Sequence, residues 1–246
     1  CPSNTFQATP MVSMNNGCKI KFVDCNKNDL CISYEDLKKK IEIYSPKAIW
    51  VVHIGGHLSF EIEKISKLCK EKKIILIEDC AHAHGASFNK KKPGSWGDAG
   101  IYSLYATKTI STGEGGILVS NNRDLIDFSK SFKNYGKPEN KVIGKNYRMS
   151  EFNAALGCVQ IDRLKDIVNW KNEKISKEIK NYTNYLKLPD GMISGYYKFI
   201  VFDKINNSTG KVYDIGCHKI FKENVKLENT DWVNNNHWCV PIYYKG

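Results

Sequence analysis

A carboxylate, a hydroxyl and an amine follow two neighbouring apolar segments of the sequence. Asp79 comes just after the apolar run of residues 74–77. Ser103 lies in the next apolar segment, residues 100–105, and Lys108 follows that segment. In an open α/β sheet, ligands bind beyond the carboxyl ends of the strands. The three polar groups are therefore predicted to meet at one edge of a sheet.

Asp79 and Lys108 also have ordinary structural explanations. Asp79 could cap the next helix or pair with a lysine, and Lys108 could be one more surface lysine in a lysine-rich chain. Lys108 lies outside the charged clusters, however, between Thr107 and Thr109, and the sequence TGEGG that follows allows a close approach of the backbone to a ligand. In a half-buried loop a lysine has a lowered pKa and can act as an amine nucleophile.

Taken together, these residues suit the cofactor pyridoxal phosphate (PLP). PLP needs a lysine for a Schiff base, an acid for its pyridinium nitrogen, and hydroxyl or backbone N–H donors for its phosphate. A metal site is the competing hypothesis, with ligands from His53, His57, Asp79, His82 and His84. No second group of ligands at a known metal spacing supports that site.

The first 120 residues alternate between strand-like and helix-like patterns, which is typical of a parallel sheet covered on both faces. The expected strands are residues 20–24, 47–56 and 74–77, and the expected helices are residues 33–44 and 59–73. The strands expected at 100–105 and 115–120 are too close together for a crossover helix.

Helical patterns dominate the next part of the chain. A helix is expected at 123–136, and a long one begins at Ser150 and continues weakly to Leu186. One face of the long helix carries Phe152, Leu156, Val159, Leu164 and Ile167. Short strands are expected at 196–202 and 237–244. We expect a large α/β domain at 1–165 and a small C-terminal α+β domain at 166–246.

Composition excludes several classes of protein. The net charge is +11, but the lysine clusters are not interleaved with aromatic residues as in a nucleic-acid-binding surface. No apolar run approaches the roughly 20 residues of a transmembrane helix, and no signal peptide is visible. The nine scattered cysteines form no dense framework, which favours a reducing compartment, the cytoplasm.

Five sequence blocks resemble the DegT/DnrJ/EryC1/StrS family of sugar aminotransferases, in order and with family-like spacing. They are CPSNTFQAT, KFVD, IEDCAHAHGASF, GSWGDAGIYSLYATKTISTGEGGILVSNN and NYRMSEFNAALG. The resemblance implies fold type I of the PLP-dependent enzymes, with a mostly parallel central sheet flanked by helices. It also implies a homodimer with shared active sites.

The resemblance implies a role for each of the three central residues. Lys108 would form the Schiff base with PLP and then shuttle the proton between the substrate carbon and the cofactor. Asp79 would pair with the pyridinium nitrogen, and Ser103 would bind the cofactor phosphate. Glu78 and His84 receive no role.

Four further residues are implied as cofactor contacts. Phe6 would stack on the pyridine ring, a task that suits an aromatic face. His82 stands where many relatives have Gln and would contact the phenolic oxygen. Asn146 and Arg148 resemble the loop that reaches into the neighbouring subunit's site.

By this resemblance, the protein would move an amino group from glutamate or glutamine to a nucleotide-linked keto-deoxysugar, in surface-polysaccharide or deoxyaminosugar biosynthesis. A cyclitol ketone is the alternative substrate, and a non-catalytic or metal-binding protein using His82 and His84 is the alternative of another class. Lys108 favours transamination, because a family fold without this lysine would suit a regulator or a dehydratase.

Two family segments do not occur in the 246 residues. One is an earlier segment with a Ser-Gly-Thr phosphate-binding turn, and the other is a helix after PIYYKG. We therefore expect the sequence to be an internal fragment of a longer protein, and expect these 246 residues alone to bind PLP poorly.

Overall fold

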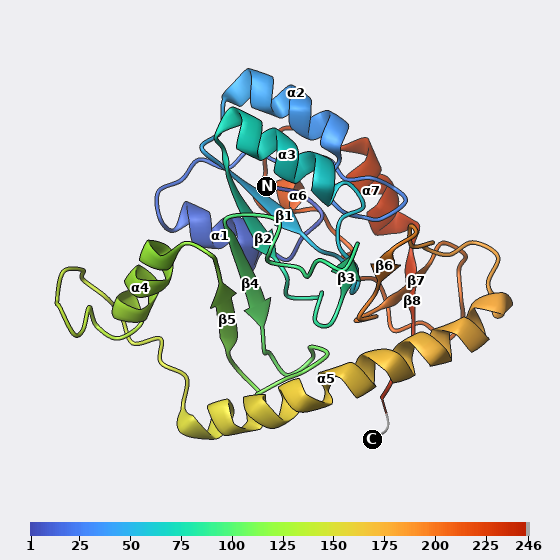
Figure 1. Cartoon of the computed structure of the whole chain (residues 1–246). Coiled ribbons are helices and arrows are strands. Elements are labelled where there is room, and N and C mark those ends of the chain that lie inside the picture. The colour runs from blue at the N-terminus through green and yellow to red at the C-terminus, as the bar shows by residue number, and fades with distance from the viewer. Residues whose placement is uncertain (245–246) are drawn as a thin grey trace.

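A four-stranded sheet in the order β1-β2-β4-β5 forms the centre of the computed structural model, which describes residues 1–244 (Figure 1). The strands β1 (Ala48–Val52), β2 (Ile75–Asp79) and β4 (Ala99–Ser103) are parallel. The edge strand β5 (Gly116–Val119) is antiparallel to β4. The mostly parallel sheet predicted from the sequence is confirmed.

Two amphipathic helices precede β1 and β2 and pack on this sheet. They are α2 (Tyr34–Tyr44) and α3 (Ile62–Lys72). Ser33 caps α2 by accepting a hydrogen bond from the backbone N–H of Asp36, as the S-x-x-D pattern predicts. The apolar faces of both helices join one hydrophobic cluster with the strand residues Val51 and Leu76.

The long helix α5 (Glu151–Glu178) connects the central sheet with a small sheet. In Figure 1 it runs from the ends of β4 and β5 towards β7 and β8. Ile167 packs against Leu104 and Ile110, which flank the Lys108 loop. Ile175 packs in a separate cluster with Phe199. The helix ends at Glu178, earlier than expected, and the 3-10 turn η1 (Ile179–Asn181) follows it.

The apolar face expected on the long helix is exposed in the first half of α5. The side chain of Phe152 is 89% exposed, Val159 56% and Leu156 44%. Apolar residues at helical spacing indicate a helix face that packs against another surface, but they do not show whether that surface belongs to the same chain.

Small sheets and short helices complete the fold. Strand β3 (Ser87–Phe88) pairs with β6 (Met192–Ile193), and β7 (Phe199–Val201) pairs with β8 (Trp238–Val240). The remaining helices are α1 (Ala8–Met14), α4 (Arg123–Phe132), α6 (Cys217–Ile220) and α7 (Glu228–Asn235). Of the helices in residues 1–244, none is long and apolar enough to cross a membrane.

The regions before and after residue 165 pack closely together. One hydrophobic cluster holds Val52 with Ile200, and another holds Phe22 with Cys217. The division into domains at 1–165 and 166–246 stays a prediction. The prediction of a strand at 20–24 is wrong. Val23 forms only an isolated bridge, to Pro2, and the apolar side chains of Phe22 and Val23 are buried although no partner strand lies beside them.

Candidate active site

A pocket of about 1260 Å³ opens at the carboxyl ends of the parallel strands. The last residues of β1, β2 and β4 are Val52, Asp79 and Ser103, and all three line it. Five of the residues predicted for the site line this pocket: Phe6, Asp79, His82, Ser103 and Lys108. The sheet edge expected from the sequence is therefore where these side chains meet.

Asp79 is held in place by two hydrogen bonds. Its Oδ2 accepts one from the Thr9 hydroxyl at 2.7 Å, and its Oδ1 accepts one from the Ala81 backbone N–H at 3.0 Å. The Thr9 hydroxyl accepts in turn from the Thr5 hydroxyl at 3.2 Å. These contacts orient the carboxylate while leaving it on the pocket wall.

Lys108 is a half-buried amine on the same wall. Burial lowers its pKa, the Asp79 carboxylate acts in the opposite direction, and Lys198 lowers it further. The Lys108 Nζ lies 5.0 Å from the ring centroid of Tyr197. A larger fraction of this lysine therefore carries a free amine at neutral pH than of an exposed lysine.

The loop that carries Lys108 is closed by backbone hydrogen bonds at its base. The N–H of Thr112 donates to the Leu104 carbonyl at 3.0 Å, and the N–H of Leu104 donates to the Gly115 carbonyl at 2.9 Å. Gly115 has a φ of +144°, and a Cβ there would lie 2.8 Å from the Met149 side chain. The glycines of TGEGG thus serve a tight turn that fixes the loop.

His82 is buried between two aromatic rings at the bottom of the pocket. Its ring stacks on Tyr197 with centroids 4.2 Å apart and on Tyr213 with centroids 5.9 Å apart. Burial holds its pKa well below the ordinary value, with Lys108 and Lys198 adding to the effect. Within residues 1–244 its buried Nδ1 has no hydrogen-bond partner, and the lowered pKa favours the neutral imidazole.

Phe6 and Ser103 also present groups to the pocket. The Phe6 side chain is 58% exposed although it lines the pocket, so its ring face is open to a ligand. The Ser103 hydroxyl accepts a hydrogen bond from the Tyr105 N–H at 3.2 Å and keeps its own proton for another acceptor.

Asn146 and Arg148 lie away from this pocket in the described chain. Arg148 donates to the Asn134 side-chain oxygen at 2.9 Å and lies over the ring of Tyr135. Neither residue lines the pocket around Lys108. The prediction that they act in a neighbouring subunit's site stays a prediction.

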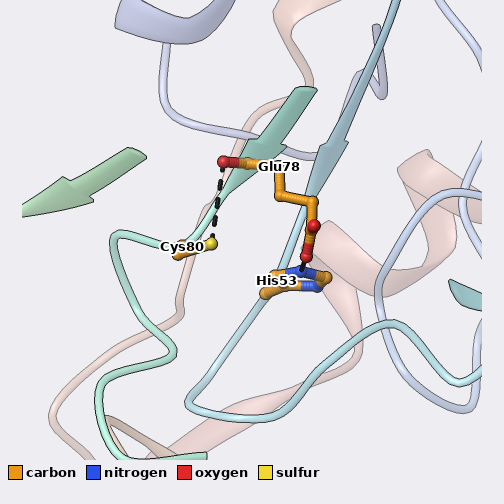
Figure 2. A group of neighbouring side chains, drawn as sticks. All are labelled: His53, Glu78 and Cys80. Atoms are coloured by element: carbon orange, nitrogen blue, oxygen red, sulfur yellow. Dashed lines mark hydrogen bonds and ion pairs between the residues drawn. The ribbon is translucent and has the colours of Figure 1, made fainter. Parts of the chain in front are cut away.

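Glu78, next to Asp79, is a buried structural carboxylate (Figure 2). Its Oε2 accepts hydrogen bonds from His53 Nε2 at 3.0 Å and from the Gly94 N–H at 2.8 Å. Its Oε1 accepts from the N–H groups of Trp96 and Gly97 at 2.7 and 2.6 Å. Glu78 therefore anchors the loop between β3 and β4 to the sheet.

The geometry around Glu78 argues against a metal site. His53, Glu78 and Cys80 form a group whose potential ligand atoms lie within 4.8 Å of one another. His53 Nδ1 already accepts from the Ser59 N–H at 3.1 Å, and its Nε2 donates to Glu78. A metal would have to displace these hydrogen bonds.

The remaining histidines of the metal hypothesis have structural contacts of their own. His57 Nε2 donates to the Asp29 carbonyl at 3.0 Å. The ring of His84 is tilted against that of Tyr102, with centroids 5.3 Å apart. Burial lowers the pKa of each histidine to about 4. Within residues 1–244 both ring nitrogens of His84 lack a hydrogen-bond partner, and His84 receives no chemical role.

Several pocket residues were missed in the sequence. Tyr197 and Lys198 lie in a segment expected to be a strand, and Tyr213 lies in a segment without any motif. Thr9 ends the block CPSNTFQAT, but no role was expected for it. Tyrosines and lysines are frequent in this chain, so their types alone gave no signal. Only the packing of the region after residue 190 against the sheet brings Tyr197 and Tyr213 to His82.

A sequence model of the DegT/DnrJ/EryC1/StrS aminotransferase family matches residues 1–190. The chain belongs to this family. The family predicted from the sequence blocks is therefore confirmed, together with the fold class. A crystal structure of a DegT DnrJ EryC1 StrS aminotransferase from Brucella abortus has the same fold, with a TM-score of 0.87 at 23% identity, over 98% of this chain and 73% of that one.

Two further DegT/DnrJ/EryC1/StrS relatives carry specific names. GDP-perosamine synthase from Vibrio cholerae is 36% identical over 177 residues, 70% of this chain and 48% of that protein. A UDP-4-amino-4,6-dideoxy-N-acetyl-beta-L-altrosamine transaminase from Campylobacter jejuni is 35% identical over 201 residues, 76% of this chain and 53% of that protein. The matches thus span about half the length of these relatives.

Proposed function

We propose that this chain forms the core of a PLP-dependent aminotransferase that moves an amino group from glutamate or glutamine to a nucleotide-linked keto-deoxysugar. The observation that carries the proposal is that Lys108, Asp79 and Ser103 line the same pocket. The names of the Vibrio and Campylobacter relatives support a nucleotide-linked sugar.

The groups in the pocket fit the needs of PLP. Asp79 supplies a fixed negative charge for the pyridinium nitrogen, and Phe6 supplies an open aromatic face for the ring. The Ser103 hydroxyl suits the phosphate, and the unpartnered Nδ1 of buried His82 suits the phenolic oxygen. When bound, the cofactor supplies an electron sink for the carbon that exchanges its amino group.

The protein's own residues would divide the work of amino transfer. Lys108 Nζ, with its pKa lowered by burial, would bind the cofactor and then hold the proton that moves to and from the reacting carbon. Asp79, oriented by Thr9, would keep its negative charge opposite the ring. His82 between its two tyrosines would orient the ring as a neutral imidazole.

We further propose a homodimer whose interface includes the first half of α5. Phe152 is 89% exposed there, and Ile143 in the preceding loop is 98% exposed. Large apolar side chains exposed along one helix face are typical of an interaction surface. In a dimer, Asn146 and Arg148 of one protomer would reach the partner's pocket.

Sedimentation tests the proposed dimer. The wild-type protein is expected to sediment with twice its monomer mass, and the Phe152→Asp variant with the monomer mass. A monomeric wild type would contradict the dimer.

A spectroscopic and a substrate experiment together test the aminotransferase proposal. The full-length protein that contains these 246 residues is expected, with added PLP, to show a visible absorption band that borohydride removes, because borohydride reduces a Schiff base. Glutamate and a panel of keto-sugar nucleotides and cyclitol ketones would then be assayed for amino transfer. Absence of a reducible band would contradict the PLP site, and transfer only to cyclitol ketones would contradict the sugar.

The nine free cysteines support a reducing compartment, so we propose the cytoplasm.

A further inference from the structure

A second pocket of about 490 Å³ adjoins the first at the Lys108 loop. Four residues line both pockets: Thr107, Lys108, Tyr197 and Lys198. The other wall of the second pocket is formed by α5 and by residues 242–244. A ligand in it would therefore lie beside the amine of Lys108.

Among the described residues, only positively charged side chains bring charge to the second pocket. Lys108, Arg163, Lys171 and Lys198 line it, and none of its described lining residues is Asp or Glu. Three of these cations remain if Lys108 is bound to a cofactor. Like charges at close quarters repel, so an anion between them would be stabilised.

Lys171 is the cation that most needs a partner. Its side chain is buried, with 6% exposed, and within residues 1–244 its ammonium makes neither a hydrogen bond nor an ion pair. Burial lowers its pKa to about 8, and Lys198 adds to the effect. Lys174, one turn later on α5, pairs with Glu178 at 3.5 Å instead.

A second polar group in this pocket also lacks a partner. The Thr109 hydroxyl is buried and has no hydrogen-bond partner within the described part of the chain. Buried polar groups are nearly always hydrogen-bonded, because an unsatisfied one costs free energy. An unpaired ammonium and an unpaired hydroxyl on the walls of one pocket indicate a missing acceptor.

We propose that this pocket binds an oxyanion of a small-molecule ligand, with the Lys171 ammonium and the Thr109 hydroxyl as donors. Both substrates of the proposed reaction supply such a group: the carboxylate of the amino donor and the phosphate of the nucleotide. The assignment to a substrate rests on the proposed function, whereas the binding of an oxyanion does not.

Calorimetric titration of the full-length protein that contains these 246 residues, with succinate and with inorganic phosphate, tests this site. Added PLP keeps the phosphate probe out of the cofactor pocket. Lys171→Met preserves side-chain length and removes the charge, and it is expected to weaken binding by about 10- to 100-fold, the range of a charged hydrogen bond. Thr109→Val, which changes only the hydroxyl, is expected to weaken it by roughly 2- to 10-fold.

Lys165→Met is the matched control, because it removes the same charge from an exposed position on α5 that does not line the pocket. It is expected to change binding less than about twofold, since exposed charges are screened. Weakening of succinate alone would identify the carboxylate as the ligand group, and weakening of phosphate alone would identify the phosphate.

The proposal is overturned if neither probe binds the wild type, or if Lys171→Met binds both as tightly as the wild type. These results are distinct from a failure of the aminotransferase proposal. If anion binding depends on Lys171 but the protein transfers no amino group, the anion-binding proposal holds and the aminotransferase proposal fails. If the protein transfers amino groups, and Lys171→Met changes neither the KM values nor anion binding, the aminotransferase proposal holds and the anion-binding proposal fails.

Discussion

Replacing Lys108 by alanine is expected to lower the rate of amino transfer by about 10³-fold or more and to remove the visible, borohydride-sensitive band. The reason is that one side chain performs two tasks, binding the cofactor and moving the proton, and a positioned acid–base group alone contributes roughly 10²- to 10⁴-fold. The measurements are single-turnover rates with glutamate and the absorption spectrum with added PLP.

Lys92→Ala is a suitable control for Lys108→Ala, because Lys92 is an exposed lysine outside both pockets. It should leave the rate and the band unchanged. A Lys108→Ala protein that keeps the band would assign the Schiff base to another amine. Lys198, which lines the same pocket, would then be the first to test.

Replacing Glu78 by alanine is expected to lower the free energy of unfolding by about 3–5 kcal/mol, because each buried donor left without its acceptor costs roughly 1–3 kcal/mol. The change would leave His53 and the backbone N–H groups of Gly94, Trp96 and Gly97 without their acceptor. Urea unfolding followed by circular dichroism measures this loss.

The exposed ion pair of Glu42 with Lys72 provides the comparison. Its N–O distance is 2.8 Å, shorter than the 3.0 Å between His53 and Glu78. Glu42→Ala should nevertheless cost less than about 1 kcal/mol, because exposed pairs are solvated on both sides. Equal losses in Glu42→Ala and Glu78→Ala would refute the anchoring role of Glu78.

The contribution of Glu78 should also depend on pH. Burial acts to raise its pKa, but hydrogen bonds from His53, Gly97 and Gly94 outweigh burial, so the pKa lies below the ordinary value of 4.5. A carboxyl group with a lowered folded-state pKa stabilises the fold above its unfolded-state pKa, and this stabilisation is lost as the pH falls through the folded-state value. The stability deficit of Glu78→Gln is therefore expected to shrink below pH 4.5.

The part of the site built on the central sheet could be predicted from the sequence. Asp79 and Ser103 end parallel strands, and strand order places such ends at one edge whatever the rest of the chain does. Lys108 follows at a distance fixed by a short closed loop. The positions of these residues can be predicted from local sequence patterns and from the rule that ligands bind at the carboxyl ends of parallel strands.

The rest of the site depends on contacts between distant parts of the chain. Tyr197 stacks on His82 across more than a hundred residues, and Lys171 reaches the Lys108 loop from the middle of α5. No local pattern encodes such pairings. The exposed face around Phe152 shows the converse, since helical spacing predicts the helix but does not predict what covers its apolar face.

The helix α5 also sets a limit on where this chain tolerates a change of length. Ile167 and Ile175 lie eight residues apart on one unbroken helix, and each fits a different cluster, one under the Lys108 loop and one under β7. Each residue added to an α-helix turns everything beyond it by about 100° and moves it by about 1.5 Å. A single insertion or deletion between these two isoleucines would therefore put one of them out of its cluster, and Lys171 between them out of its pocket. Surface loops can absorb insertions, whereas this stretch must keep its residue count.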